Sequence, residues 1–226
     1  MKKFVILLFV IFYPPYSLSH MAHYNKYNKI EMEIFRNGEV IGYNYYFFKR
    51  DGNKSIITNQ IRFSVKLLGK TIFYVEGYGE EKYLKDQLIS YNSKTLQNNK
   101  EKYVSLTLDK NTSKFDIKGS SYNGKASLDN VIGNWWNHKI LQTNTQISPI
   151  SGSVKEQVVT FIGKEKINQY GKTYEVDHFT LKSKDMSLPK DKRLDFNIWY
   201  DKESSMIVKV SYSRMGDWEY RLKNIN

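Results

Sequence analysis

The sequence predicts an all-β protein in which antiparallel strands follow one another as a meander and form a strongly curved sheet or a barrel. Three features of the 226-residue chain support this fold. Apolar and polar side chains alternate with period two through most of the chain, which places them on opposite faces of a strand. Turn-forming residues interrupt the alternation at short intervals. No long window shows a helical repeat of apolar residues, and no internal repeat of fixed length is evident.

The clearest alternation lies in residues 193–222. Polar breaks at residues 201–205 and 215–217 divide this stretch into three runs of alternating side chains. Tight turns at the breaks allow neighbouring runs to pair as antiparallel strands. We therefore expect three consecutive strands here, with Ile198 on one face of the first strand and Trp199 on the other.

The first hairpin is expected around Asn37-Gly38, because Asn-Gly accepts the positive φ angles of a type I′ turn. The strand that follows, residues 40–48, is apolar on both faces. One face carries Val40, Tyr46 and Phe48, and the other carries Ile41, Tyr43, Tyr45 and Phe47. A strand with two apolar faces needs a cover on each, so we expect it to be central in the sheet or to line a cavity.

Further strands are expected at intervals along the chain. The candidate ranges are residues 30–35, 57–67, 71–75, 83–91, 103–109, 113–118, 154–162 and 172–181. Residues 94–102 and 183–192 are interpreted as polar loops. The alternation fails in residues 128–141, where a short helical or irregular excursion is expected.

The start of the chain has the pattern of a secretory signal. A charged beginning is followed by an apolar run at residues 4–13, two prolines and small residues that end at Ser19. The run is shorter than the roughly 20 residues that a membrane-spanning helix needs. We expect a signal peptide at 1–19 and a single β-barrel-like domain at 20–226, periplasmic or secreted, with no stable transmembrane anchor after cleavage. An uncleaved anchor is the alternative.

Cysteine usage and charge narrow the classes of partner. The chain contains no cysteine, so no disulfide and no lipid-modified cysteine are expected. The formal charge is +12, and it falls to +10 without Lys2 and Lys3. The lysines are scattered rather than clustered, and an abundance of Lys and Asn favours a general compositional bias over a polyanion site. Because export also separates the chain from nucleic acid, we expect no nucleic-acid partner.

The patterns of common catalytic and metal sites are missing from the sequence. His20 and His23 lie in the polar start, and His178 follows Asp177, whose side chain points to the opposite face of a strand. No HExxH motif, carboxylate-rich calcium loop, GxSxG motif or glycine-rich phosphate loop is present. We therefore expect no enzyme, no catalytic residue, no metal and no cofactor. A hydrolase with a dispersed site, tested at His138 and His178, is an alternative.

Aromatic side chains supply the candidate ligand-binding residues. Trp135 and Trp136 lie in the irregular excursion, where wide rings can line the mouth of a pocket or contact a sugar ring. The simpler interpretation is that these tryptophans belong to the core. The other candidates lie on strand faces that need a cover, and they are Tyr43, Tyr45, Phe47 and Trp199.

Several motifs resemble a family of uncharacterised exported bacterial domains. They are FRNGEVIGYNYYFFKRDG at residues 35–52, NWWN at 134–137, LDFNIWYDKESSMIVKVSY at 194–212 and the closing EYRL. The IWYDKES…IVK hairpin is more distantly similar to the W-x-D-x-x-x-G-x-x-x-K hairpin of the LolA and RseB-like periplasmic fold, although it lacks the glycine. The resemblance implies an antiparallel, barrel-like sheet in the periplasm, and it carries over no catalytic residues.

The leading hypothesis is a non-enzymatic β-domain that binds an apolar or amphipathic partner, such as a lipid or another envelope component. Export, the strands with two apolar faces and the resemblance support it. A structural or protein-interaction domain with a filled core is the first alternative, and the hydrolase with a dispersed site is the second. The sequence carries no signal for the oligomeric state.

Overall fold

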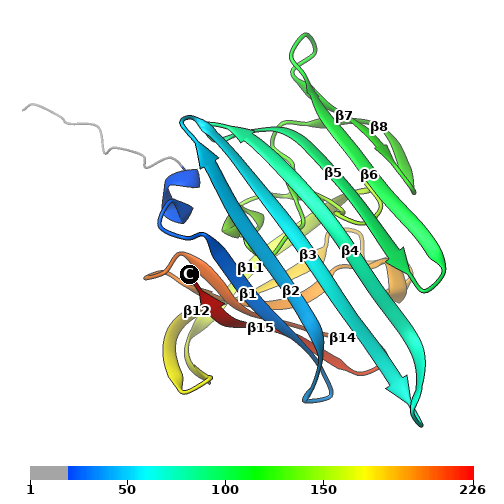
Figure 1. Cartoon of the computed structure of the whole chain (residues 1–226), viewed down its shortest axis with the longest axis vertical. Coiled ribbons are helices and arrows are strands. Elements are labelled where there is room, and N and C mark those ends of the chain that lie inside the picture. Colours follow the sequence, from blue (N-terminus) through cyan, green and yellow to red (C-terminus); the bar gives the residue numbers. More distant parts are fainter. Residues whose placement is uncertain (1–19) are drawn as a thin grey trace, which may run out of the picture.

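The computed structural model describes residues 20–226, and nearly all of them belong to one sheet (Figure 1). The predicted signal peptide, residues 1–19, lies outside the described residues. Three short 3₁₀ helices interrupt the strands in the described part: η1 (His20–Tyr24), η2 (His138–Leu141) and η3 (Lys190–Lys192).

The sheet has fifteen strands. The first eight are β1 (Lys29–Arg36), β2 (Glu39–Asp51), β3 (Lys54–Leu67), β4 (Lys70–Leu84), β5 (Gln87–Gln97), β6 (Lys100–Asp109), β7 (Lys114–Gly119) and β8 (Tyr122–Ser127). The others are β9 (Val131–Ile132), β10 (Thr145–Ile147), β11 (Val154–Gln169), β12 (Lys172–Ser183), β13 (Asp195–Asp201), β14 (Met206–Ser213) and β15 (Asp217–Ile225).

The strand order confirms the predicted antiparallel meander. The order across the sheet is β8-β7-β6-β5-β4-β3-β2-β1-β15-β14-β13-β12-β11-β10-β9, so the first and last strands pair in its middle. Neighbouring strands are antiparallel except β9 and β10, which are parallel. The sheet is strongly curved but does not close into a barrel, because β8 and β9 form its two edges.

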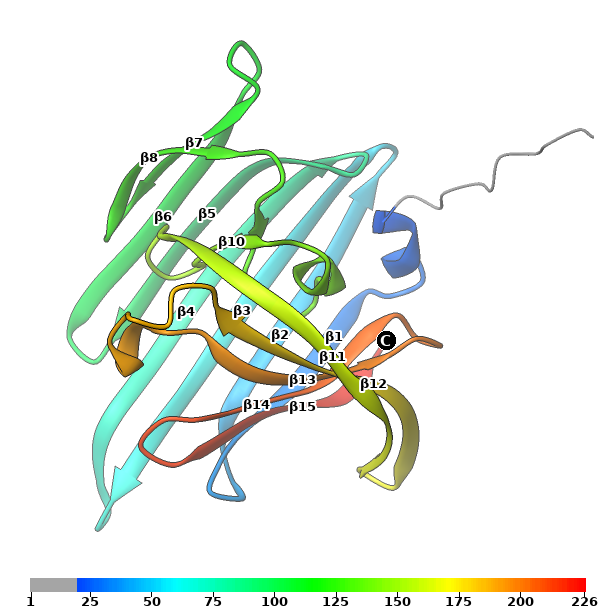
Figure 2. The same ribbon diagram turned by 180° about the vertical axis from the view of Figure 1, so that it is seen from behind.

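The curvature brings the two halves of the sheet face to face. Figures 1 and 2 show β11 to β14 lying across one side of β1 to β6. We call the faces that meet the inner faces and the opposite ones the outer faces. Apolar side chains from both halves are buried between the inner faces, among them Ile34, Tyr46, Ile57, Leu106, Ile198 and Val210. Burial of these alternating residues is the main source of stability for such a sheet.

The predicted hairpin at Asn37-Gly38 is confirmed. The φ angles of these residues are 51° and 84°, and both must be positive in a type I′ turn. Tyr170-Gly171 adopts the same combination, with φ angles of 50° and 77°. The backbone twist of this turn type matches the right-handed twist of the two strands that each turn joins.

Two of the predicted boundaries in the middle of the chain were wrong. Residues 83–91 hold the end of β4, a turn at Lys85-Asp86 and the start of β5. Residues 94–102, predicted as a polar loop, form the β5–β6 hairpin with its turn at Asn98. Both turns place a residue other than glycine at positive φ, 53° in each, so the glycine that most clearly marks such a turn is missing. The inner face of β5 also carries small polar residues, which hides its alternation.

The predicted excursion at residues 128–141 is confirmed. This segment contains only the two-residue strand β9 and the helix η2. The side chain of Asn137 caps η2 by accepting a hydrogen bond from the Lys139 N–H at 3.0 Å. The segment places Trp135, Trp136 and His138 among the buried residues of the core.

Candidate functional site

The structure separates the predicted ligand-binding residues into three places. Trp135 and Trp136 are buried in the core. Tyr43, Tyr45 and Phe47 are half-buried on the outer face of β2, opposite to the buried Tyr46 and Phe48. Trp199 is half-buried on β13, in the other half of the sheet. These residues therefore do not form one site.

Trp136 is a core residue with aromatic neighbours on several sides. Its ring makes edge-to-face contacts with Tyr24, Phe48 and Tyr83, at centroid distances of 5.0, 5.5 and 6.0 Å. Aromatic pairs prefer this geometry. The indole N–H donates a hydrogen bond of 2.8 Å to Oε1 of Glu81. The ring thus fills the space between the inner faces.

Glu81 is a buried carboxyl group that the sequence analysis missed. Only 2% of this residue is exposed. Its oxygens accept hydrogen bonds from Tyr83 Oη at 2.6 Å, Asn134 Nδ2 at 2.7 Å and Trp136 Nε1. Burial raises the pKa of Glu81, and the three hydrogen bonds oppose that rise. The alternation of β4 contained the signal, because Glu81 shares a face with the apolar residues of that strand.

A second buried polar contact joins η1 to η2. Tyr24 Oη lies 2.6 Å from Nδ1 of His138 and accepts a hydrogen bond from the His138 backbone N–H at 3.1 Å. Burial, helped by the nearby charge of His23, lowers the pKa of His138 to about 4. His138 is therefore a neutral ring in the core, and its contacts with Tyr24 hold the end of the irregular segment 128–141 in place.

The outer face of β2 to β6 carries a groove of about 660 Å³. Two cross-strand rows of side chains form its walls. One row is Tyr43, Arg62, Glu76, Leu96 and Glu101, and the other is Gln60, Tyr78, Lys94 and Tyr103. Gly77 and its neighbours in register lie between the rows, where their side chains turn toward the inner face and leave the backbone as the floor.

The walls of the groove combine apolar and cationic groups. Tyr78, Leu96 and Tyr103 are among the exposed large hydrophobic residues of the chain. Arg62 and Lys94 supply two positive charges beside the two carboxylates of Glu76 and Glu101. Tyr43 is held by stacking on Tyr45, with 4.4 Å between the ring centroids. Such a surface can hold a molecule that has both an apolar part and an anionic part.

Neighbouring side chains hold the predicted candidate Trp199 in place. His178 stacks on its ring at a centroid distance of 4.6 Å, and Lys209 Nζ lies 4.8 Å from the ring centroid. Its indole N–H donates to Glu165 Oε2 at 3.0 Å, while Glu165 Oε1 contacts His178 Nδ1 at 2.6 Å. Asp177 instead pairs with Lys202. Asp177 and His178 therefore make separate contacts, as their positions along one strand predicted.

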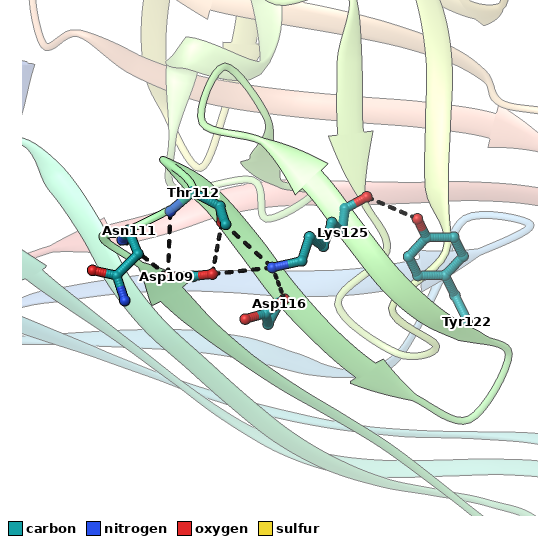
Figure 3. Close-up of polar contacts among 6 residues, drawn as sticks. All are labelled: Asp109, Asn111, Thr112, Asp116, Tyr122 and Lys125. Atoms are coloured by element: carbon teal, nitrogen blue, oxygen red, sulfur yellow. Dashed lines mark hydrogen bonds and ion pairs between the residues drawn. The ribbon is translucent and has the colours of Figure 1, made fainter.

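The remaining acidic cluster lies on the surface at β6, β7 and β8. Lys125 Nζ lies 3.0 Å from Asp109 and 2.9 Å from Asp116, and the Thr112 hydroxyl donates to Asp109 at 2.7 Å (Figure 3). The single ammonium group of Lys125 thus pairs with both carboxylates. Across residues 20–226 the structure contains no group of three or more His, Asp or Glu side chains that could hold a metal ion.

Within the described range, every helix is too short or too polar to cross a bilayer.

Comparisons with known proteins agree with this architecture. The sequence model of one family, described as "Domain of unknown function (DUF6134)", matches residues 32–223. The predicted resemblance to a domain of unknown function is thereby confirmed. No curated protein matches the chain.

Solved structures show the fold alone. A crystal structure of a beta-barrel-like protein of the domain of unknown function DUF1849, from Brucella abortus, is 11% identical and superposes with a TM-score of 0.57. The match covers 88% of this chain and 95% of that one. A DUF1329 family protein from Desulfovibrio piger is also 11% identical, over 92% of this chain and 88% of that one. Its TM-score is 0.18, which is too low to support an argument.

Proposed function

The chain belongs to the DUF6134 family, and we propose that it is a non-enzymatic envelope protein that binds an amphipathic ligand in the groove across β2 to β6. The observation that carries this proposal is the groove itself. It combines apolar walls with the cationic side chains of Arg62 and Lys94 on an accessible face of the sheet.

The size and chemistry of the groove suit a lipid-like molecule. Small-molecule sites commonly have volumes of about 300 to 1,000 Å³, and this groove lies in that range at about 660 Å³. The apolar part of the ligand packs against Tyr78, Leu96 and Tyr103. An anionic headgroup pairs with Arg62 or Lys94 at the walls.

The interior of the sheet supports an outer site rather than an inner one. Trp136 is fully buried and Trp135 nearly so, and both occupy space between the inner faces. The Glu81 hydrogen bonds fix Trp136 in that position. An acyl chain would have to displace these rings and leave the buried carboxyl without its donors, which is costly.

Native mass spectrometry tests the proposal on protein purified gently from its own cell envelope. We expect an additional bound mass that organic extraction assigns to an anionic lipid or a related amphiphile. Purified protein should also bind a micelle-free lysophospholipid, measured by the change in the emission of the tyrosines that line the groove.

Matched variants locate the site. Tyr78→Ala combined with Lys94→Gln should weaken lysophospholipid binding at least tenfold. The control is Leu84→Ala combined with Lys82→Gln, because both residues are exposed and lie outside the groove. The mass of the protein alone, together with undetectable lysophospholipid binding, would contradict the proposal. Equal binding by both double variants would place the ligand elsewhere.

A further inference from the structure

Several turns of the sheet meet at one end of the molecule. β1 pairs with β2 on one side and with β15 on the other, so the β1–β2 and β14–β15 turns lie at the same end. The Asp217 N–H of the second turn donates to Asn37 Oδ1 of the first at 2.8 Å. Arg214 donates to the carbonyl oxygens of Lys190 and Arg193, which places the β12–β13 loop beside these turns.

The β3–β4 turn lies at the same end of the sheet. Gly42, near the start of β2, pairs with Phe63, near the end of β3, so the last residues of β3 run toward the β1–β2 turn. Figure 2 shows the tips of these hairpins in its lower part. We call this end of the molecule the rim, and it consists of residues 36–40, 66–72, 184–193 and 213–217.

The rim carries the most exposed apolar side chains of the described chain. Leu68, Met215 and Leu67 are exposed by 96%, 90% and 60%, more than any other large hydrophobic residue in the range 20–226. Single exposed apolar residues are common on protein surfaces, but these gather at neighbouring turns. The rim has further exposed apolar residues at Ile72, Met186 and Leu188.

Turn geometry by itself favours polar residues or glycine at the two most exposed tips. Leu68 and Met215 have φ angles of 49° and 51°, and each precedes a glycine at positive φ. Asn, Asp and Gly are preferred at such positions, and a bulky apolar residue is uncommon there. The neighbouring Asn37-Gly38 turn has the preferred residue. The two tips therefore hold apolar side chains in solvent against the local preference, which indicates a contact outside the chain.

Cationic side chains surround the exposed apolar ones. The rim contains eight lysine and arginine residues and four aspartate and glutamate residues. Lys66 and Lys70 are exposed and flank the tip at Leu67 and Leu68. Apolar side chains at the boundary of headgroups and acyl chains, with lysine or arginine at headgroup level, are typical of contacts with a membrane surface. A protein partner more usually covers one contiguous apolar patch, whereas the rim offers separate tips.

We propose that the rim docks on the surface of an anionic lipid bilayer, with Leu67, Leu68 and Met215 inserted among the headgroups. The lysines and arginines pair with the anionic headgroups, so salt should weaken the contact. Because no residue of the rim lines the groove, this surface is distinct from the proposed ligand site.

Co-sedimentation with lipid vesicles tests the proposal. The purified protein should bind vesicles of equal parts phosphatidylglycerol and phosphatidylcholine at least tenfold more tightly than vesicles of phosphatidylcholine alone. Leu68→Asn combined with Met215→Asn should weaken the binding to the anionic vesicles at least tenfold. Asparagine accepts positive φ, so this double variant keeps both turns. The matched control is Leu84→Asn, which should bind like the wild type because Leu84 is exposed at the opposite end of β4.

Lysine variants test the role of charge. Lys66→Gln and Lys70→Gln should each weaken the binding to the anionic vesicles by about fivefold. The control is Lys82→Gln, because Lys82 is exposed on β4 but lies outside the rim. It should leave the binding unchanged.

A single label reports insertion directly, because the chain contains no cysteine. A polarity-sensitive dye on Leu68→Cys should shift its emission to shorter wavelength when the anionic vesicles are added. The same dye on Leu84→Cys should not shift. Circular dichroism that matches the wild type confirms that both labelled variants are folded.

The outcomes separate the parts of the proposal. Absence of binding to the anionic vesicles would overturn it and would favour a protein as the partner of the rim. Binding that persists in the Leu68 and Met215 double variant, or an equal shift of both dyes, would place the contact elsewhere. Equal binding to both kinds of vesicle would overturn the role of the cations. Tyr78→Ala combined with Lys94→Gln changes only the groove and should keep vesicle binding, so the two proposals fail separately.

Discussion

Trp136 donates its indole N–H to the carboxyl group of Glu81 across 2.8 Å, and this bond ties the segment after β9 to the inner face of β4. The two residues are 55 positions apart in the sequence. Asn134 donates to the same oxygen at 2.7 Å. A buried carboxyl group whose hydrogen-bond donors are all neutral thus joins the irregular excursion to the regular sheet.

Removal of the Glu81 carboxyl should strongly destabilise the fold. Glu81→Ala leaves the donors on Tyr83, Asn134 and Trp136 without their acceptor, and we expect a loss of about 3 to 5 kcal/mol in the free energy of unfolding. Glu81→Gln keeps one acceptor oxygen and should cost about 1 kcal/mol. Urea denaturation measures both.

The neighbouring residue is the control for this prediction. Glu80 lies on the outer face and pairs with Lys82 at 3.0 Å. Exposed pairs contribute about 0 to 1 kcal/mol, so Glu80→Ala should lie within that range. Equal losses for Glu80→Ala and Glu81→Ala would contradict the role assigned to the buried carboxyl.

His138 should make the protein less stable as the pH falls. Its pKa is lowered to about 4 in the folded chain, while an unfolded histidine titrates near 6.5. Between these values the unfolded chain binds more protons, so stability decreases from pH 6.5 toward pH 4, by roughly 3 kcal/mol in total.

A comparison of variants isolates the histidine. The raised pKa of Glu81 acts in the opposite direction, because the folded state takes up that proton first and gains stability as the pH falls. Since Glu81 is present in both proteins, the difference between wild type and His138→Gln reports His138. Thermal unfolding at several pH values should show a smaller loss of stability between pH 6.5 and pH 4 for the variant than for the wild type. Parallel curves of stability against pH would contradict the role assigned to His138.

Gly42 should not tolerate even one added methyl group. A Cβ atom at this position would lie 2.1 Å from the Arg62 carbonyl oxygen and 2.4 Å from Phe63 Cβ. The first of these is a backbone atom in the paired strand β3, which cannot move without breaking the ladder. We expect Gly42→Ala to destabilise the fold by about 2 to 4 kcal/mol in urea denaturation.

Gly163→Ala is the matched control. No atom lies within 4 Å of the Cβ position of Gly163, so the change should stay within about 0.5 kcal/mol. A loss at Gly163 as large as that at Gly42 would show that flexibility of the chain, not the close approach, sets the cost.

The pKa of Asp109 should stay below its ordinary value when Lys125 is removed. The Thr112 hydroxyl is the first cause of its lowered pKa of about 2, and the Lys125 ammonium is the second. Lys125→Met should therefore raise this pKa only part of the way toward 3.8. A carboxyl-detected NMR titration measures it, and complete recovery of the ordinary value would contradict the role of Thr112.

Local pattern predicted the elements better than it predicted the site. Alternation around Ile198 and Trp199 assigned these residues to opposite faces, and the structure agrees, with Ile198 fully buried and Trp199 half-buried. The prediction failed at Lys85 and Asn98, which form tight turns without glycine. Of the residues that line the groove, only Tyr43 was among the predicted candidates, because the others are ordinary polar or aromatic residues of separate strands.

The sequence by itself determined the all-β class, the meander, the first hairpin and the irregular excursion, because side-chain period and turn chemistry act between residues close together in the chain. Only the tertiary structure decided that β1 pairs with β15, that Trp136 meets Glu81 and that the turns at Leu68 and Met215 lie at the same end of the sheet. These relationships join distant residues. Their stability depends on which strands and side chains the curved sheet places opposite one another, and no local sequence pattern encodes those partners.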